Sequence, residues 1–319
     1  MNCLKIAFVG LGSIGTRHLK NTYKYLKNFN VHFEIDVYRS NLERELPDNI
    51  VSLISRQLLV DEDIDDSSVY DALFITNPTS LHFETLVKFQ NHAKCFFIEK
   101  PVFSRTDVDL SLLSKIHSQN CYVACPLRYN SVIEYVKDNI NVSDVLSIKA
   151  VSSSYLPDWR PGTDYRKCYS AHTDMGGGVD IDLIHEWDYI THIFGDMDYG
   201  FCISDKISDL EIDSNDIAIY IAKNKHITVE LHLDYFGRVN QRTVELFTKD
   251  DTVKCDILNG EILFSNSNTL IKLESERNDY QMKEIEHFFK IVFSETESDS
   301  TVEHALKVLK YAKGNFSIK

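Results

Sequence analysis

Residues 5–15 read KIAFVGLGSIG, and this stretch decides the fold of the amino-terminal part of the chain. The apolar run predicts a buried strand, and Gly10, Gly12 and Gly15 follow it as a GxGxxG motif. Residues 14–29 then place apolar side chains at helical spacing. A strand, a glycine turn and a helix in this order predict a dinucleotide-binding unit with the pyrophosphate at the helix N-terminus. The predicted pyrophosphate contacts are Gly10, Gly12, Ser13, Ile14 and Gly15.

The alternation of strands and helices continues outward from this motif to about residue 125. Further apolar runs predict strands at residues 33–38, 72–76, 95–98 and 122–125, with helical patterns between most of them. Strands alternating with helices predict an α/β fold with a doubly wound parallel sheet, and continuous apolar runs fit a sheet that is covered on both faces. We therefore predict a Rossmann-type nucleotide-binding domain over residues 1–125.

A different pattern begins at about residue 126. Helical spacing at residues 131–139 and 180–194 is followed, over residues 200–273, by short segments in which apolar and polar side chains alternate. That alternation predicts a mostly antiparallel sheet with one packed face and one more polar face. Two further helical patterns close the chain, and we assign residues 126–319 to a second, α+β domain.

The overall composition narrows the class of partner. The chain has 319 residues with 48 acidic and 34 basic side chains, so its formal net charge is −14. This acidic balance argues against nucleic acid or an anionic membrane as the main partner. No run of about 18 apolar residues and no signal-peptide pattern is present. The seven cysteines, without a CxxC motif, favour reduced thiols and a cytoplasmic protein, and no cluster of His and Cys predicts a metal site.

The end of the second predicted strand bears on the choice of dinucleotide. A dinucleotide-binding sheet reads the adenosine ribose there, with Asp or Glu for a 2′-hydroxyl and Arg for a 2′-phosphate. If the strand ends at Tyr38, Arg39 and Ser40 occupy the reading position, which favours NADP. The alternative is a solvated Arg39 with Asp36 in the acidic role, which would favour NAD.

Polar residues follow two more strands of the predicted sheet. Ligands of such sheets bind at the carboxyl ends of the strands. The segment after residues 72–76 would therefore contact the cofactor, although a surface position for His82 is the alternative. Glu99 and Lys100 come directly after the strand at residues 95–98, and an ammonium there could polarise a substrate oxygen. The predicted contacts from these segments are Thr76, Asn77, Pro78, His82, Glu99 and Lys100.

A histidine between carboxylates follows a run of three glycines. In the sequence GGGVDIDLIHEWD, Asp182, His185 and Asp188 would share one side of a helix. Neighbouring carboxylates can hold an imidazole in one tautomer and tune it to accept a proton near neutral pH. On composition alone, a structural histidine on a helix is the favoured interpretation.

These motifs, in this order, resemble the glucose–fructose oxidoreductase and inositol dehydrogenase family, Gfo/Idh/MocA. The resemblance covers nearly the whole chain, and it rests on GLGSIGTRH, TNPTSLH, EKP, the RY of CPLRYN, and GGGVDIDLIHEWD followed by IFG. It implies a Rossmann domain followed by a domain with an open-faced antiparallel sheet. It also implies an NAD(P)-dependent oxidoreductase that acts on sugars or related polyols, and a homodimer or homotetramer that associates through the open sheet face.

The resemblance also implies roles for single residues. Lys100 matches the catalytic lysine of the EKP motif, and His185 matches the residue that accepts or donates the substrate proton. Asp182 matches the acid that positions the substrate and this histidine, while Arg128 and Tyr129 match an arginine–aromatic pair. One departure concerns the acid, because the family usually has DxxxH where this sequence has DxxH. On a regular helix the missing residue would rotate the acid by about 100°.

The segment at residues 155–172, YLPDWRPGTDYRKCYSAH, is the candidate for substrate contacts. Aromatic faces and guanidinium groups suit sugar rings and carboxylate or phosphate groups. The segment resembles a subfamily associated with surface-polysaccharide and nonulosonate sugars; a structural loop is the alternative. The predicted substrate contacts are Arg128, Tyr155, Trp159, Arg160, Asp164, Tyr165 and Arg166.

Three hypotheses of function remain at this stage. The first is hydride transfer between the nicotinamide and a sugar hydroxyl or carbonyl, with NADP favoured over NAD. The second is an enzyme that oxidises its substrate transiently with a retained cofactor, for elimination, hydrolysis or epimerisation. The third is a non-catalytic sugar or nucleotide sensor, which would need neither Lys100 nor His185.

Overall fold

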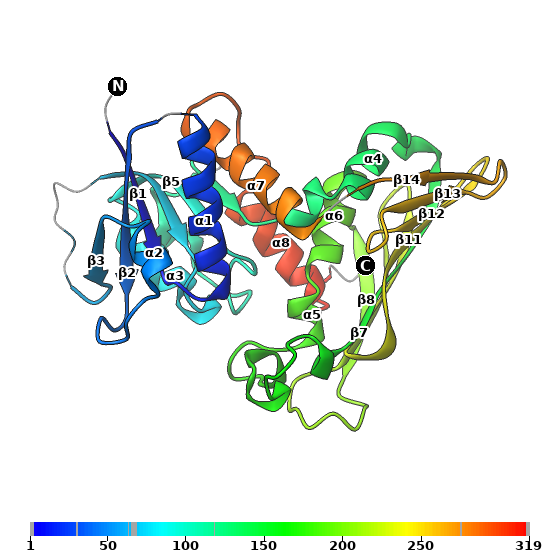
Figure 1. Cartoon of the computed structure of the whole chain (residues 1–319). Helices are drawn as coiled ribbons and strands as arrows, with labels where there is room; N and C mark the ends of the chain where they lie inside the picture. Colours follow the sequence, from blue (N-terminus) through cyan, green and yellow to red (C-terminus); the bar gives the residue numbers. More distant parts are fainter. Residues whose placement is uncertain are drawn as a thin grey trace. The chain divides into compact units, whose positions relative to one another are not determined.

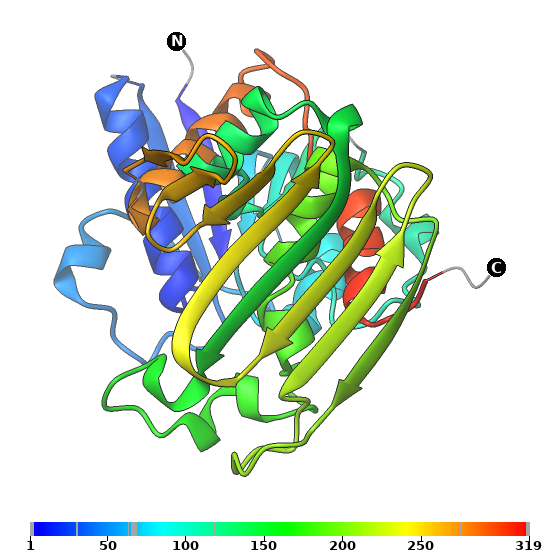
Figure 2. The ribbon, with the colours of Figure 1, turned by 90° about the vertical axis from the view of Figure 1, so that its right-hand side faces the viewer.

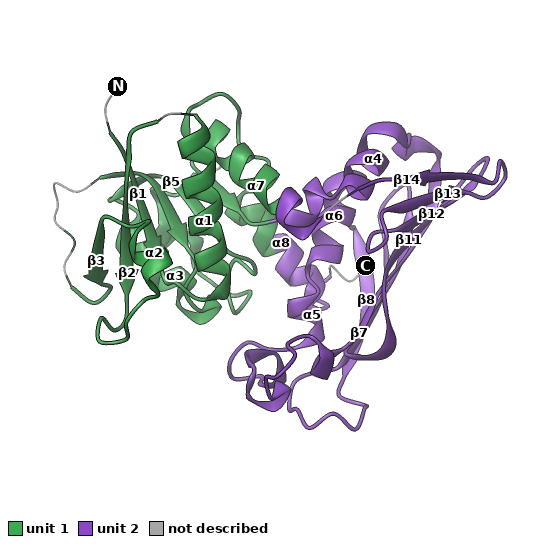
Figure 3. Ribbon diagram, in the orientation of Figure 1, with its two compact units in different colours: residues 1–124, 281–306 green, residues 125–280, 307–319 purple. Residues whose placement is uncertain are grey.

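The computed structural model describes residues 3–29, 31–62, 64, 69–117, 119–274 and 276–316. The chain divides into two compact units, which are coloured separately in Figure 3. Unit 1 comprises Met1–Ala124 and Gln281–Leu306, and unit 2 comprises Cys125–Tyr280 and Lys307–Lys319.

Unit 1 is built on a parallel sheet, as the alternating pattern predicted. Its described strands follow the order β3-β2-β1-β4-β5-β6, and every pair of neighbours is parallel. Helix α1 runs alongside this sheet in Figure 1. The elements are β1 (Leu4–Val9), α1 (Ser13–Asn28), β2 (Phe33–Arg39), α2 (Asp48–Val51), β3 (Arg56–Leu59), β4 (Tyr70–Ile75), α3 (His82–Phe89), β5 (Ala93–Ile98) and β6 (Cys121–Val123).

The strand order of unit 1 defines where a ligand can bind. The chain moves outward from β1 in one direction through β2 and β3, and in the other through β4, β5 and β6. The carboxyl ends of β1 and β4 therefore flank the switch point at which doubly wound sheets bind their ligands. A main-chain hydrogen bond joins the ends of these two strands, because the Thr76 amide donates to the Val9 carbonyl at 3.0 Å.

A segment from late in the sequence completes unit 1. Helix α7 (Arg277–Val292) places Phe288 and Phe289, both fully buried, among the aromatic side chains of the sheet and of α1. The Phe288 ring lies 5.2 Å from Phe74 and 5.3 Å from Phe97, and Phe289 stacks on Tyr25 at 5.4 Å. Residues 126–319, predicted to form one domain, do not all group together, because residues 281–306 belong with the first unit.

Unit 2 is built on a larger, mixed sheet that is mostly antiparallel. Its described strands follow the order β14-β13-β12-β11-β7-β10-β9-β8, with β7 and β10 as the parallel pair. The sequence alternation predicted this sheet, and the Asn259-Gly260 turn joins β12 to β13. The strands are β7 (Val145–Tyr155), β8 (Tyr199–Asp205), β9 (Ile217–Lys223), β10 (Thr228–Asp234), β11 (Phe236–Thr248), β12 (Thr252–Asp256), β13 (Glu261–Phe264) and β14 (Thr269–Lys272).

The two faces of the sheet in unit 2 differ. On one face lie α5 (Val179–Asp182) and α6 (His185–Phe194), whose Trp187 contacts Tyr220 of β9 edge to face at 5.3 Å. The other face is turned toward the viewer in Figure 2, and no described helix crosses it there. Large apolar side chains are exposed on the strands, among them Phe201 at 65% and Ile221 at 56%.

Three general features complete the description. All seven cysteines are free thiols. Among the helices formed by the described residues, none is both long and apolar enough to cross a membrane. The same part of the chain brings together no group of three or more His, Cys, Asp or Glu side chains with the geometry to hold a metal ion.

Candidate functional site

The glycine-rich loop of unit 1 joins β1 to α1 at the switch point of the sheet. Gly10 has a φ of +88°, a value that L side chains rarely adopt, and its amide donates to the Tyr38 carbonyl of β2 at 2.9 Å. A Cβ on Gly15 would lie 2.6 Å from the Gly10 carbonyl oxygen and 2.5 Å from Thr76 Oγ1. These two glycines are therefore required by the fold of the loop itself.

Gly12 has a different environment, and it fits the predicted dinucleotide. A Cβ on Gly12 would meet nothing within 4 Å, so this backbone faces open space. Gly12 is also the N-cap of α1, where no side chain caps the helix and no acidic residue lies in the first turn. The amides of the first turn therefore point toward a position that a pyrophosphate could fill. The loop fits a dinucleotide cofactor, whose pyrophosphate could contact the backbone at Gly12, Ser13 and Ile14.

The segment that follows β4 is fastened to this loop. Thr76 Oγ1 donates to the Gly10 carbonyl at 2.6 Å, and Asn77 Nδ2 donates to Thr85 Oγ1 at 2.8 Å. His82 lies beneath the segment with 1% exposure, and its ring nitrogens lie 3.0 Å from the Asn77 carbonyl and 3.2 Å from the Val102 carbonyl. Burial lowers the pKa of His82. His82 is thus neither a surface residue nor placed for direct contact with a ligand, but it supports the loop.

The carboxyl end of β5 carries Glu99 and Lys100. The Glu99 amide donates to the Ile75 carbonyl of β4 at 2.9 Å, which places this pair of residues beside the Thr76 segment. Glu99 is 9% exposed, and its carboxylate lies 2.5 Å from His18 Nε2. Lys100 is half-buried, and its main-chain amide donates to the second oxygen of Glu99 at 3.1 Å. The Glu99 side chain is therefore buried behind the end of β5, while Lys100 is partly exposed just after it.

The charged side chains at the end of β2, Asp36 and Arg39, are both hydrogen-bonded within unit 1. Asp36 accepts hydrogen bonds from Arg56 Nη2 at 2.6 Å and from the Tyr70 hydroxyl at 2.9 Å. Arg39 is 9% exposed, with Nη1 donating to Gln57 Oε1 at 2.6 Å and Nη2 donating to the Arg44 carbonyl. Ser40 is exposed next to it. Asp36 lies within the strand, opposite Ala7, whereas Arg39 directly follows the residue that binds the glycine loop.

In unit 2, the segment that contains Asp182 and His185 is not a single helix. The prediction of one helix over residues 180–194 was wrong, because α5 ends at Asp182 and α6 begins at His185. Between them, the amides of Ile184 and Glu186 each bond to the carbonyl three residues earlier, at 3.4 Å. The chain is therefore wound more tightly there than an α-helix.

This tighter winding bears on the DxxH spacing. In an α-helix, residues three apart are separated by about 300° around the axis, whereas in a 3₁₀ turn they lie one above the other. A 3₁₀-like turn at this point would offset the rotation expected from DxxH, in which one residue fewer separates the acid and the histidine than in DxxxH. His185 is half-buried and Asp182 is 6% exposed.

The carboxylate of Asp182 is held by two phenols. Its Oδ1 accepts from the Tyr169 hydroxyl and its Oδ2 from the Tyr235 hydroxyl, both at 2.6 Å. These are short, charge-assisted hydrogen bonds from two separate segments of unit 2. Burial, together with the Asp182 charge, raises the pKa of Tyr169 and of Tyr235 above the usual value, so both phenols remain protonated donors. The position of Asp182 is therefore fixed by its surroundings.

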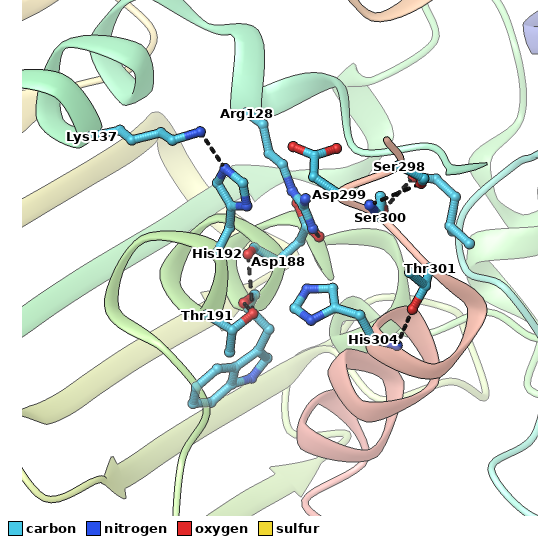
Figure 4. Close-up of polar contacts among 12 residues, drawn as sticks. Arg128, Lys137, Asp188, Thr191, His192, Ser298, Asp299, Ser300, Thr301 and His304 are labelled. Atoms are coloured by element: carbon cyan, nitrogen blue, oxygen red, sulfur yellow. Dashed lines mark hydrogen bonds and ion pairs between the residues drawn. The ribbon is translucent and has the colours of Figure 1, made fainter. Parts of the chain in front are cut away.

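The second carboxylate near His185 has a separate partner. Asp188 binds Arg128 through two hydrogen bonds, Nε to Oδ2 at 2.9 Å and Nη2 to Oδ1 at 2.6 Å. Figure 4 shows both residues, with His192 of the same helix facing Lys137 Nζ at 3.0 Å. Arg128, in the 3₁₀ turn η3 (Pro126–Tyr129), is 4% exposed. This bidentate pair fastens α6 to the start of unit 2.

The segment at residues 155–172 forms three 3₁₀ turns and encloses a small pocket. The pocket is open to solvent, its cavity volume is only about 10 Å³, and its walls include Trp159, Arg160 and Tyr165. Trp159 contacts Tyr235 edge to face at 5.3 Å, and the exposed Arg160 guanidinium lies 5.5 Å from the centre of the Tyr169 ring. This side of the segment is thus built on the two phenols that bind Asp182.

Other residues of the segment are engaged within unit 2. Arg166 pairs with Asp164 at 2.8 Å and with Glu211 at 3.0 Å, so two carboxylates already surround its guanidinium. Tyr155 lies under the Arg238 guanidinium, 3.7 Å from its ring centre. Of the predicted substrate contacts, Trp159, Arg160 and Tyr165 line the pocket, whereas Asp164 and Arg166 shape the loop.

Three residues of these clusters were not among the predicted site residues: His18, Tyr169 and Tyr235. His18 follows Gly15 by three positions on the buried face of α1, a spacing that could have drawn attention to it. Tyr235 ends an alternating run whose other apolar members face the core, so its inward direction could be anticipated. Nothing in the sequence indicates that Tyr169 and Tyr235 meet at one carboxylate.

The amino-terminal part of the chain matches a known class of protein domain. Residues 4–124 match the family model described as "Oxidoreductase family, NAD-binding Rossmann fold", designated GFO_IDH_MocA. The match agrees with the glycine loop, the parallel sheet and the residues at its strand ends. Over these residues the chain matches the Gfo/Idh/MocA family of oxidoreductases, and the resemblance noted from the sequence is confirmed for this part of the chain.

Similar proteins and solved structures cover nearly the whole chain. The uncharacterized oxidoreductase YrbE of Bacillus subtilis is 23% identical over 310 residues, which covers 94% of this chain and 83% of that protein. UDP-N-acetylglucosamine 3-dehydrogenase GnnA from Acidithiobacillus ferrooxidans has a similar fold, with a TM-score of 0.75, 19% identity and coverage of 98% and 96% of the two chains. The WlbA dehydrogenase from Bordetella pertussis, solved with NADH and UDP-GlcNAcA, gives a TM-score of 0.77, 14% identity and coverage of 98% and 95%.

Proposed function

We propose that this protein is an NAD(P)-dependent dehydrogenase or reductase that transfers hydride between the nicotinamide and a sugar or sugar-derivative. The observation that carries the proposal is the gathering of the glycine loop, Thr76 and Lys100 at the carboxyl ends of three adjacent strands. The relatives GnnA and WlbA support a nucleotide-linked sugar as the substrate class. A role in the synthesis of surface-glycan sugars is the corresponding biological proposal.

The chain's own residues have distinct parts in this proposal. A bound nicotinamide dinucleotide would supply or accept the hydride. The backbone at Gly12, Ser13 and Ile14 holds the pyrophosphate, and Lys100 donates a hydrogen bond to the reacting oxygen and stabilises negative charge on it. His185 takes the proton from a hydroxyl or returns it to a carbonyl. Asp182, fixed by two phenols, orients that imidazole.

Arg160 supports an anionic or nucleotide-linked substrate. Its guanidinium is exposed at the pocket and has no carboxylate bonded to it in the described part of the chain, in contrast to Arg166. The Tyr169 ring lies beneath it, so an arriving phosphate or carboxylate would meet a guanidinium that is already oriented.

The catalytic part of the proposal is tested at Lys100. Lys100→Ala should lower turnover by about 10²-fold or more while NADH affinity changes by no more than about threefold. Lys94→Ala is the matched control, because Lys94 lies near the other end of β5 in an exposed pair with Asp71. The assay follows nicotinamide absorbance with UDP-N-acetylglucosamine and a panel of free sugars. Full activity of Lys100→Ala would remove the proposed mechanism, and binding of neither NADH nor NADPH would favour a sensor.

We further propose a preference for NADP over NAD. Its support is Arg39, which directly follows the β2 residue that accepts the Gly10 amide and would need to leave Gln57 to reach a 2′-phosphate. Fluorescence titrations with NADPH and NADH compare the wild type with Arg39→Asp. The proposal expects tighter NADPH binding in the wild type and loss of that preference, by about tenfold or more, in the variant. Tighter NADH binding by the wild type would contradict it.

Two broader proposals follow from the same chain. The exposed apolar side chains on one sheet face of unit 2, such as Phe201 and Ile221, support association into a homodimer or homotetramer through that face. Light scattering at micromolar concentration would contradict this association if the measured mass were that of one chain.

The second of these proposals concerns location. Seven free thiols support a cytoplasmic location.

A further inference from the structure

A buried pair of side chains lies directly behind Lys100 in unit 1. His18 of α1 is 1% exposed, and its Nε2 lies 2.5 Å from Glu99 Oε1. The imidazole packs edge-on against the Phe97 ring, with 4.8 Å between ring centres. Its Nδ1 has no hydrogen-bond partner among the described residues, so the bond to Glu99 is the polar contact that orients the ring.

Glu99 contacts both His18 and Lys100. Its second oxygen accepts the main-chain amide of Lys100 at 3.1 Å. Burial raises the pKa of Glu99, but the hydrogen bond and charge of His18 and the charge of Lys100 outweigh burial, so the net direction is down. Glu99 is therefore a carboxylate at neutral pH, and its charge acts on the Lys100 ammonium.

We infer that His18 and Glu99 are a positioning pair that keeps Lys100 oriented and in its ammonium form. A buried carboxylate without a partner takes up a proton, because the charged form loses its hydration. His18 prevents this, so the negative charge beside Lys100 persists. This inference rests on the proposed role of Lys100.

The position of His18 on α1 also links the His18–Glu99 pair to the predicted dinucleotide site. His18 lies about one turn beyond Gly15, on the helix whose N-terminus fits the pyrophosphate. The same helix thus binds the dinucleotide at its first turn and orients the β5 residues at its second. Movement of α1 would change the position of both groups together.

The experiment measures the reactivity of Lys100 itself. Purified protein is pulse-labelled with acetic anhydride at pH 8, and acetylation of Lys100 is quantified by mass spectrometry against the other lysines. Glu99→Gln keeps the side-chain volume but removes the charge, and His18→Phe keeps an aromatic ring but removes the donor. Both should raise the labelling rate of Lys100 by about tenfold, because more of it loses its proton.

Two further variants separate positioning from packing. His18→Gln keeps a donor near the position of Nε2, so it should return the labelling rate to within about twofold of wild type. His92→Gln is the matched control, since His92 lies before the amino end of β5 and its Nδ1 also has no hydrogen-bond partner among the described residues. In steady-state assays, Glu99→Gln and His18→Phe should lower kcat and leave KM for the nicotinamide nucleotide unchanged.

The outcomes distinguish this inference from the proposed function. Wild-type labelling of Lys100 in Glu99→Gln would overturn the inference, and so would slower labelling in His18→Phe. If His18→Phe fails to fold, as judged by circular dichroism, Glu99→Gln decides the question. Retained turnover in Lys100→Ala would instead overturn the proposed function, whatever the labelling shows.

Discussion

The two units form their parts of the candidate site in different ways. In unit 1, the predicted contacts follow the ends of neighbouring strands, and the main chain provides much of the geometry, as at Gly10 and Gly12. In unit 2, the Asp182 cluster depends on side chains from separate segments, because Tyr169 precedes α5 and Tyr235 follows β10. A site formed by backbone leaves a motif in the sequence, whereas a site formed by dispersed side chains does not.

The strongest test of this comparison separates two glycines of one loop. Gly15→Ala forces a Cβ against the Gly10 carbonyl and Thr76, so the free energy of unfolding should fall by about 3 kcal/mol. Gly12→Ala adds its Cβ to open space and should leave the stability nearly unchanged, while NADH binding weakens by about tenfold, or 1.4 kcal/mol. Urea unfolding and fluorescence titration measure the two effects. Equal loss of stability in both variants would contradict the distinction.

A smaller effect tests the side-chain cluster of unit 2. Tyr235→Phe removes a donor to the buried Asp182 carboxylate and should lower the free energy of unfolding by about 2 kcal/mol. Tyr220→Phe is the matched control, because Tyr220 is equally buried but donates to the neutral Ala312 carbonyl, and about 1 kcal/mol is expected. A larger loss in the control would show that the charge of Asp182 does not strengthen its bonds.

The smallest effect concerns His82 in unit 1. Burial lowers its pKa in the folded state, so the unfolded chain binds the proton more tightly. Stability should therefore be fully present above about pH 6.5 and decline as the pH falls below that value. His82→Gln should flatten this decline between about pH 7 and 5, and the exposed His32→Gln should not. Thermal melts across this range provide the measurement, and parallel profiles for wild type and His82→Gln would count against the assignment.

The fold could be predicted from the sequence largely because each feature is local. The run KIAFVGLGSIG specifies a strand, a turn and a helix within a few residues, and the alternating strands of unit 2 carry their own period. The return of residues 281–306 to unit 1 could not be predicted this way. An amphipathic helix shows that it has a buried face but not which sheet covers it.

In the candidate site too, the local features were predicted from the sequence and the contacts between distant residues were not. The motif positions of Gly12, Thr76 and Lys100 lie at strand ends, as sheet topology requires. The partners of Asp182 and Glu99 were not predicted, because hydrogen bonds between distant residues depend on the folded geometry. The break between α5 and α6 was also missed, since no Gly or Pro marks residues 181–186.

The late helix α7 also has a consequence for folding during translation. Phe74 and Phe97 emerge early from the ribosome, but Phe288, which packs against both rings, is synthesised only after all of β7–β14. At about 5–20 residues per second, this interval lasts roughly 10–40 s. During that time the nascent sheet of unit 1 has an aromatic surface without its native cover, which is the kind of surface that chaperones bind.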